Sequence, residues 1–137
     1  MEALTLLKLI GVQMLGRKAR LMNKYKQGDI YFFDFNPSLG SEMRKVRPCV
    51  IISNNQYNSI FNTVIVMPIS SSDKYQKEEK YQKSPLFYTL KNKKVYGTIL
   101  LQHIRTVDPK KRICSDLKDK LTLDEIQKIR QIINQFF

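Results

Sequence analysis

The residues best suited to chemistry lie in a short polar loop, residues 37–48, whose charged side chains include Glu42, Lys45 and Arg47. Strongly hydrophobic stretches precede and follow this loop, so its charges are held on rigid supports. Pro48 favours an extended backbone at Arg47, which leads that arginine directly into the next strand. A guanidinium group offers a fork of donors that matches two phosphate oxygens. The loop is therefore a candidate phosphate-binding site.

The charge of the chain indicates the kind of partner. Among 137 residues, 24 Lys and Arg face 12 Asp and Glu, which gives a net charge of +12. Such an excess favours a polyanionic partner, either a nucleic acid or an acidic protein, although a merely basic surface is the alternative. Two cysteines, Cys49 and Cys114, are too few for a disulfide framework or a metal cluster, and both are expected to be reduced thiols in a cytoplasmic protein.

The elements that must position the loop are mostly strands. Short apolar runs predict strands at 28–35, 49–52, 63–69, 85–90 and 97–107, the last two joined by a hairpin turn at 91–94. Residues 71–84 are charged and poor in aliphatic side chains, which predicts a long solvated loop. A capping-box pattern at Thr122 and Glu125 precedes isoleucines at helical spacing, which predicts a C-terminal helix. We expect a β-rich α+β fold, a small, strongly curved sheet or half-open barrel with that helix packed on it.

The first 24 residues differ from the rest. Their apolar side chains follow helical spacing, and they carry five basic residues against Glu2. The apolar run is interrupted by Lys8 and lacks a cleavage site, so it is a poor signal peptide, and it is too short to span a membrane. We expect an extension at 1–24, either an amphipathic helix or a disordered segment, with translation from Met22 as a third possibility. The globular domain is expected at 25–137.

Five sequence blocks carry a resemblance to a known family. They are GDIY at 28–31, NPSLGSE at 36–42, VRP at 46–48, VIVMPIS at 64–70 and IRTVD at 104–108. In order and spacing these blocks resemble the MazF/PemK (Kid) family of toxin endoribonucleases, over roughly residues 25–136. The resemblance implies a homodimer of SH3-like barrels that cleaves single-stranded RNA, including mRNA, at short sequence motifs. It further implies that no metal or other cofactor is used and that an acidic, MazE-like antitoxin blocks the site.

The products that the resemblance implies are a cyclic phosphate and a 5′-hydroxyl, which arise when the 2′-OH of the RNA attacks the neighbouring phosphorus. This reaction needs stabilisation of the charge on phosphorus, a proton acceptor and a proton donor. Arg47 matches the catalytic arginine of the family. We assign it to electrostatic clamping, because a guanidinium group holds its proton too tightly to act as a good base.

Other matched positions are less decisive. Ser70 stands where the family usually has threonine, and its hydroxyl could serve the phosphate or simply cap a turn. Gln102 and Leu100 stand where the Kid branch has an acid and an arginine, so that acid–base assignment does not transfer. His103 could replace the acid, or be a half-buried or interface histidine. Gln102 and His103 cannot both face one cleft if they lie in a regular strand.

The remaining candidates are expected to shape the site or to contact RNA. Tyr75 and Tyr81 could stack on bases, or belong to an ordinary solvated loop. Family positions with a supporting or RNA-binding role are Gly40, Ser41, Glu42, Lys45, Arg105 and Thr106. The function expected from the resemblance is that of a type II toxin endoribonuclease. The alternative is a non-catalytic toxin or binding module on the same barrel, such as the related fold that poisons DNA gyrase.

Overall fold

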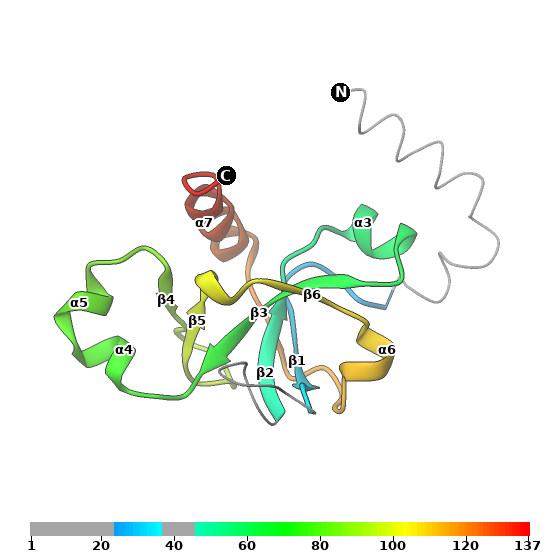
Figure 1. Ribbon diagram of the computed structural model, residues 1–137, viewed down its shortest axis with the longest axis horizontal. Helices are drawn as coiled ribbons and strands as arrows, with labels where there is room; N and C mark the ends of the chain where they lie inside the picture. The colour runs from blue at the N-terminus through cyan, green and yellow to red at the C-terminus, as the bar shows by residue number, and fades with distance from the viewer. Residues whose placement is uncertain (1–23, 37–45) are drawn as a thin grey trace.

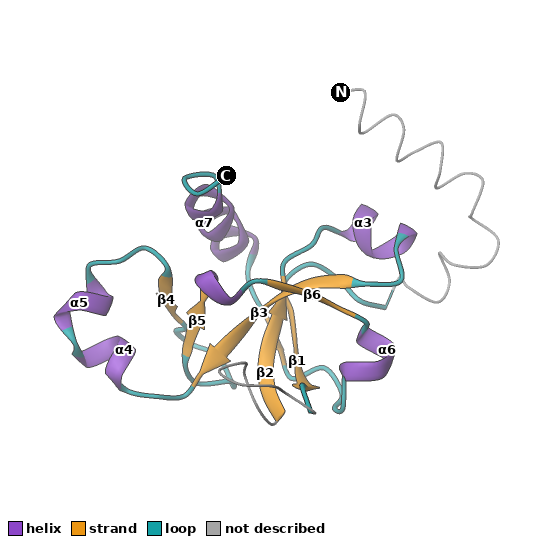
Figure 2. Cartoon of the chain, viewed as in Figure 1, coloured by secondary structure: helices purple, strands orange, loops and turns teal. Residues whose placement is uncertain are grey.

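A computed structural model describes residues 24–36 and 46–137 of the chain. The predictions for the extension at 1–23 and for Gly40, Ser41, Glu42 and Lys45 lie outside the described residues. The described part is a curved antiparallel sheet with short helices at its margins and one longer helix, α7 (Leu123–Ile133), at its C-terminal end (Figures 1 and 2). The predicted half-open barrel with a C-terminal helix is confirmed.

The strands form one sheet, in which the path β4-β5-β3-β2-β1-β7 runs from edge to edge and β6 pairs with β3 beside it. All of these pairs are antiparallel. The strands of the described residues are β1 (Asp29–Asp34), β2 (Val46–Ile51), β3 (Val64–Ser70), β4 (Phe87–Thr89), β5 (Thr98–Leu100), β6 (Arg105–Val107) and β7 (Asp119–Lys120). The central strand β3 contacts three neighbours, β2, β5 and β6, because its two ends pair with different strands.

Side chains alternate between two faces of the sheet, and each face has its own apolar cluster. We call one the helix face, because Ile129 of α7 packs there among Ile30, Val50 and Ile99. The other, the arginine face, buries Phe33, Cys49, Ile51 and Val66 among other residues. Alternate residues of β2 therefore belong to opposite faces: Cys49 and Ile51 to the arginine face, and Val50 to the helix face.

The helix α7 begins where the sequence predicts. The Thr122 hydroxyl accepts from the Glu125 N–H, and the Glu125 carboxylate accepts from the Thr122 N–H at 2.9 Å, which completes the capping box. Ile126 and Ile129 then turn toward the sheet. A Cβ on Gly28, at φ +93°, would lie 2.9 Å from the side chain of Ile126, so glycine permits both the local turn and the close approach of α7.

The segment predicted as one strand at 97–107 is two strands, and here the prediction is wrong. A 3-10 turn, η1 (Leu101–His103), separates β5 from β6. The physical reason is the pairing with β3: β5 pairs with its C-terminal end at Ser70, and β6 pairs with its N-terminal end at Val64. The chain must bend between the two, so the strand alternation assumed for Gln102 and His103 does not apply.

The segment 71–84 is also more ordered than predicted. It holds two short helices, α4 (Lys74–Lys77) and α5 (Glu79–Gln82), which project beside β4 (Figure 1). The rings of Tyr75 and Tyr81 pack on Phe87 of β4, with centroid distances of 5.1 and 4.9 Å. Two further short helices, which the sequence did not predict, are α3 (Asn55–Ile60), capped by Asn54, and α6 (Pro109–Arg112), capped by Asp108.

Candidate phosphate and RNA site

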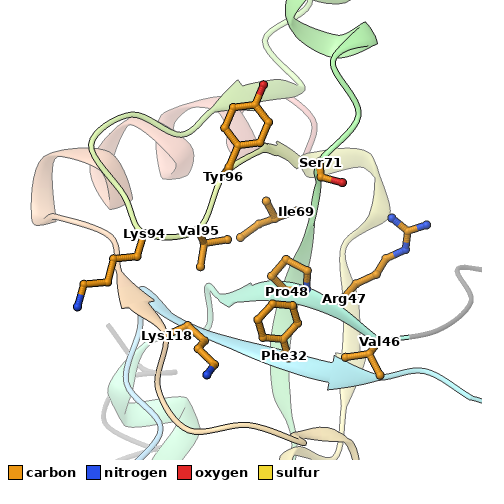
Figure 3. A pocket seen from close by; sticks show the side chains of 10 residues that line it. All are labelled: Phe32, Val46, Arg47, Pro48, Ile69, Ser71, Lys94, Val95, Tyr96 and Lys118. Carbon is orange, nitrogen blue, oxygen red and sulfur yellow. The ribbon is translucent and has the colours of Figure 1, made fainter.

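A cleft of about 580 Å³ opens beside the sheet where β2 and β3 meet the 91–96 turn (Figure 3). Its walls combine apolar side chains with a polar and cationic rim. The lining residues are Phe32, Val46, Arg47, Pro48, Ile69, Ser71, Lys94, Val95, Tyr96 and Lys118. Apolar surface can bind the face of a base, and lysine and arginine can bind phosphate oxygens. The cleft therefore has the chemistry that a single-stranded nucleic acid requires.

Of the predicted site residues that the structure describes, Arg47 is the one that lines this cleft. It pairs with Phe33 across β1 and β2, and its side chain extends away from Pro48 to the edge of the cleft (Figure 3). Its Nε atom is buried and has no hydrogen-bond partner within residues 24–36 and 46–137. A buried donor of this kind is costly to leave unpaired, so it suits an acceptor that arrives with a ligand.

Arg105 lies on the arginine face of the sheet, as Arg47 does. It pairs with Val66 of the arginine face, and its guanidinium lies 4.5 Å from the centroid of the Phe35 ring. Burial raises the pKa of the Cys49 thiol, and the positive charges of Arg105 and Arg47 act against that rise. Two guanidinium groups thus place positive potential around Cys49, on the side of the sheet from which Arg47 projects.

Ser70 is almost buried, with 7% of its surface exposed. Its Oγ accepts from the Ser72 N–H at 3.2 Å, which is the turn-capping role considered from the sequence. The next residue, Ser71, lines the cleft. Extending the register from the Cys49–Pro68 pair brings Ser70 level with Arg47, on the arginine face. Ser70 is therefore beside the cleft, and its hydroxyl proton remains available to an acceptor.

The structure does not bring the 102–106 candidates to this cleft. Gln102, His103 and Thr106 are exposed, and η1 turns the first two away from regular strand geometry. Gln102 instead lines a second, apolar groove of about 220 Å³ near the end of α7. The residues of this groove are Met67, Leu86, Leu101, Gln102, Ile104, Ile133, Phe136 and Phe137. The ring pairs of Tyr75 and Tyr81 belong to the α4–α5 packing rather than to an open stacking surface.

Among the cleft residues missed from the sequence are Lys94, Tyr96 and Lys118. The Tyr96 hydroxyl donates to Asp73 at 2.8 Å, which ties the start of α4 to the cleft rim. The Lys94 N–H donates to the Asp119 carboxylate, so the 91–96 turn is fixed against β7. The run of lysines at 91–94 was a visible signal of a cationic turn. Nothing near Lys118 in the sequence indicated that it would join the same cleft.

No group of three or more His, Cys, Asp or Glu side chains within residues 24–36 and 46–137 could hold a metal ion. In the same ranges, no helix has the length and apolar character needed to cross a membrane.

Residues 26–137 match the family described as the PemK-like, MazF-like toxin of type II toxin-antitoxin systems. The match spans most of the chain and includes every strand and helix described above. This chain belongs to that family of toxins. The resemblance inferred from the five sequence blocks is therefore confirmed.

Solved structures show the same fold. MazF from Deinococcus radiodurans has a TM-score of 0.64 at 21% identity, and the match covers 81% of this chain and 94% of that one. An endoribonuclease in complex with its cognate antitoxin from a mycobacterial species has a TM-score of 0.61 at 17% identity, and the match covers 83% of this chain and 93% of that one. A MazE–MazF structure from D. radiodurans has a TM-score of 0.62 at 21% identity, and the match covers 81% of this chain and 93% of that one. The toxin thus shares their half-open barrel.

Proposed function

We propose that this toxin is a sequence-selective endoribonuclease that cleaves single-stranded RNA, including mRNA, without a metal ion. The proposal depends on Arg47, which lies at the edge of a cleft with apolar walls and a cationic rim. The Nε atom of this arginine is buried and has no hydrogen-bond partner among the described residues. Family membership and the likeness to a mycobacterial endoribonuclease support the same activity.

The reaction proceeds by attack of the 2′-OH on the adjacent phosphorus, with departure of the 5′-oxygen. The P–O bond to the 2′-oxygen forms as the bond to the 5′-oxygen breaks, which leaves a cyclic phosphate and a 5′-hydroxyl. Negative charge grows on the non-bridging oxygens, and the Arg47 guanidinium is placed to stabilise it. The Ser70 hydroxyl adds a donor from the neighbouring strand. Lys94 and Lys118 hold flanking phosphates, and Val95 and Tyr96 contact a base.

The test is cleavage of a mixed RNA by the purified full chain in EDTA, followed by sequencing of the 5′-hydroxyl ends. Wild type is expected to cut at a short motif, and Arg47→Ala to lower the rate by at least about a hundredfold. Arg130→Ala, an exposed arginine on α7, is the matched control and should cut at the wild-type rate. If EDTA abolishes cleavage, or if Arg47→Ala cuts normally, the proposal is wrong. Absence of any cleavage would favour the non-catalytic alternative.

The charge of the chain supports an acidic antitoxin as the second partner. The cleft rim offers Arg47, Lys94 and Lys118 in a chain of net charge +12, which favours a negatively charged segment. The likeness to MazE–MazF structures points to the same kind of complex. Binding of an acidic peptide encoded beside this chain should weaken with salt and should compete with RNA. A peptide that binds without affecting cleavage would contradict this assignment.

The apolar groove supports a homodimer. Phe136 and Phe137 are 52% and 89% exposed, and Ile104 is 36% exposed at the same groove. A contiguous apolar surface of this kind marks an interaction site, and a second copy of the chain is the occupant we propose. Sedimentation should give a dimer, and Phe136→Asp should give a monomer. The proposed place of action is the cytoplasm, where RNA is the substrate and the thiols stay reduced.

A further inference from the structure

One buried hydroxyl on the arginine face is left without a partner. Thr98 is fully buried, and its Oγ1 makes no hydrogen bond within residues 24–36 and 46–137. The only other buried side-chain polar atom in this condition within those ranges is the Nε of Arg47. An unpaired buried hydroxyl costs about 1–3 kcal/mol, so its presence calls for an explanation.

The sheet register places Thr98 beside the candidate site. Ser70 and Thr98 are directly opposite each other across β3 and β5, so their side chains leave the same face of the sheet. Directly opposite residues have Cβ atoms about 4.5–5.5 Å apart. Ser70 is in turn level with Arg47 when the register of β2 and β3 is extended. Arg47, Ser70 and Thr98 therefore form one row across three strands.

Gly97, which precedes Thr98, allows β5 to lie close to the end of β3. A Cβ at Gly97 would lie 2.4 Å from the Ser70 carbonyl oxygen and 2.8 Å from the Ile69 side chain, and its φ is +144°. Only glycine accepts both the backbone conformation and the contact. The start of β5 is thus held tightly against the end of β3, which keeps Thr98 next to Ser70 rather than at a loose sheet margin.

Ser70 needs such a neighbour if its hydroxyl is to act on a ligand. A serine side chain rotates about χ1 more readily than a β-branched one, and its Oγ now accepts from Ser72 N–H. To donate its proton to a phosphate oxygen at the Arg47 side, Ser70 must hold its oxygen in a fixed place. A second donor to Oγ would fix it and would polarise the O–H bond toward the phosphate.

We propose that Thr98 is a positioning residue for RNA cleavage: its O–H donates to Ser70 Oγ while the Ser70 O–H donates to the scissile phosphate. The arrangement exchanges hydrogen bonds and transfers no proton. Thr98 is fully buried and acts through Ser70 without touching the RNA. This inference rests on the proposed endoribonuclease function. It explains why a buried strand position holds threonine, whose hydroxyl has no partner among the described residues, rather than valine, which has the same shape without the hydroxyl.

The test compares Thr98→Val, which removes the hydroxyl at nearly constant shape, with Thr98→Ser, which keeps it. We expect Thr98→Val to lower the single-turnover rate of RNA cleavage about tenfold, with the KM for RNA unchanged and the thermal midpoint equal or higher. Thr98→Ser should stay within about threefold of wild type. In a Ser70→Ala background, Thr98→Val should have no further effect, because the two residues act as one unit.

Each other outcome overturns a distinct claim. If wild type cuts RNA and Arg47→Ala does not, but Thr98→Val cuts at the wild-type rate, Thr98 has no positioning role and the endoribonuclease function stands. If Thr98→Val lowers the rate equally with and without the Ser70 hydroxyl, Thr98 does not act through Ser70. If wild type never cuts RNA, the proposed function itself fails. Should Thr98→Val not fold, Thr98→Ala removes the hydroxyl without added bulk and gives the same comparison.

Discussion

The two faces of the sheet differ in how completely their polar groups are paired. On the helix face, the apolar cluster is sealed by α7, whose capping box is complete and whose Glu125 carboxylate pairs with Lys93 at 2.7 Å. On the arginine face, Arg47 and Thr98 each keep a buried polar atom without a partner among the described residues. Unpaired buried polar groups reduce stability, and proteins tolerate them at functional sites, where a ligand supplies the missing hydrogen-bond partner. Both unpaired atoms, which we assign to catalysis, therefore belong to the arginine face, whereas the apolar wall of the cleft, with Ile69 and Val95, belongs to the helix face.

The largest effect on stability is expected at the helix face. Ile129 is 2% exposed within the cluster beneath α7, so Ile129→Ala leaves a cavity and should lower the free energy of unfolding by about 3 kcal/mol. Leu123→Ala on the same helix is the control, because Leu123 is 86% exposed and its loss should matter little. Urea denaturation measures both. RNA cleavage per folded molecule should be unchanged in both variants, and a loss of rate in Ile129→Ala would break the division between the faces.

The arginine face should show the reverse response. Arg47→Met removes a guanidinium with an unpaired Nε and keeps the apolar stem, so the free energy of unfolding should stay within about 0.5 kcal/mol of wild type or rise. Cleavage should fall at least about a hundredfold, equivalent to about 2.7 kcal/mol of transition-state stabilisation. Denaturation and cleavage are measured on the same sample. A clear loss of stability would mean that Arg47 braces the fold.

These two variants also show what the sequence could and could not predict. The apolar run ending at Ile51 and the helical spacing around Ile129 are local patterns, so the strands and α7 were predictable. Arg47 was predictable because Pro48 fixes its backbone and the family motif includes it. Thr98 was not, since a β-branched residue in a strand looks ordinary until the register sets it opposite Ser70.

The remaining errors have the same origin in long-range pairing. The bend at Leu101–His103 depends on which end of β3 each half of the segment joins, and no local signal reports that choice. The helices of residues 71–84 are held by Phe87 and Tyr96, which lie outside the segment. The cleft likewise takes Lys118 from far along the chain. Sequence patterns therefore predicted the elements better than the site that the elements assemble.

A smaller effect, dependent on pH, is expected at the ion pair of the helix face. Burial acts to raise the pKa of Glu125, but the hydrogen bond from Lys93 and those from Thr122 outweigh it, and the pKa is lowered from its ordinary value of 4.5. A depressed folded-state pKa stabilises the fold above the unfolded-state pKa. That stabilisation is lost as the pH falls through the folded-state value.

Glu125→Gln keeps the capping acceptor and removes the charge. It should lower the free energy of unfolding by about 1 kcal/mol at pH 7, and the difference from wild type should shrink as the pH falls below the ordinary Glu pKa of 4.5. Asp124→Asn is the control, because Asp124 pairs with Lys128 at an exposed site, with the two side chains 76% and 56% exposed. Urea denaturation across pH 3–7 measures all three proteins. A difference that persists unchanged at pH 3 would show that the charge of Glu125 is not the cause.

The smallest effect is expected from removing residues 1–21, which tests whether the domain is complete without its N-terminal extension. The described contacts begin with the Lys24 ammonium, 4.8 Å from the centroid of the Tyr25 ring; Tyr25 itself is 4% exposed and packs edge-on against Tyr31, with ring centroids 5.9 Å apart. Gln27 then binds the Ile52 carbonyl at 2.8 Å, which anchors the chain ahead of β1. Because these contacts survive the deletion, the free energy of unfolding should change by less than about 0.5 kcal/mol, and the cleavage rate should be unchanged. A larger loss of stability would make the extension part of the domain, and loss of cleavage alone would give it a role in RNA cleavage.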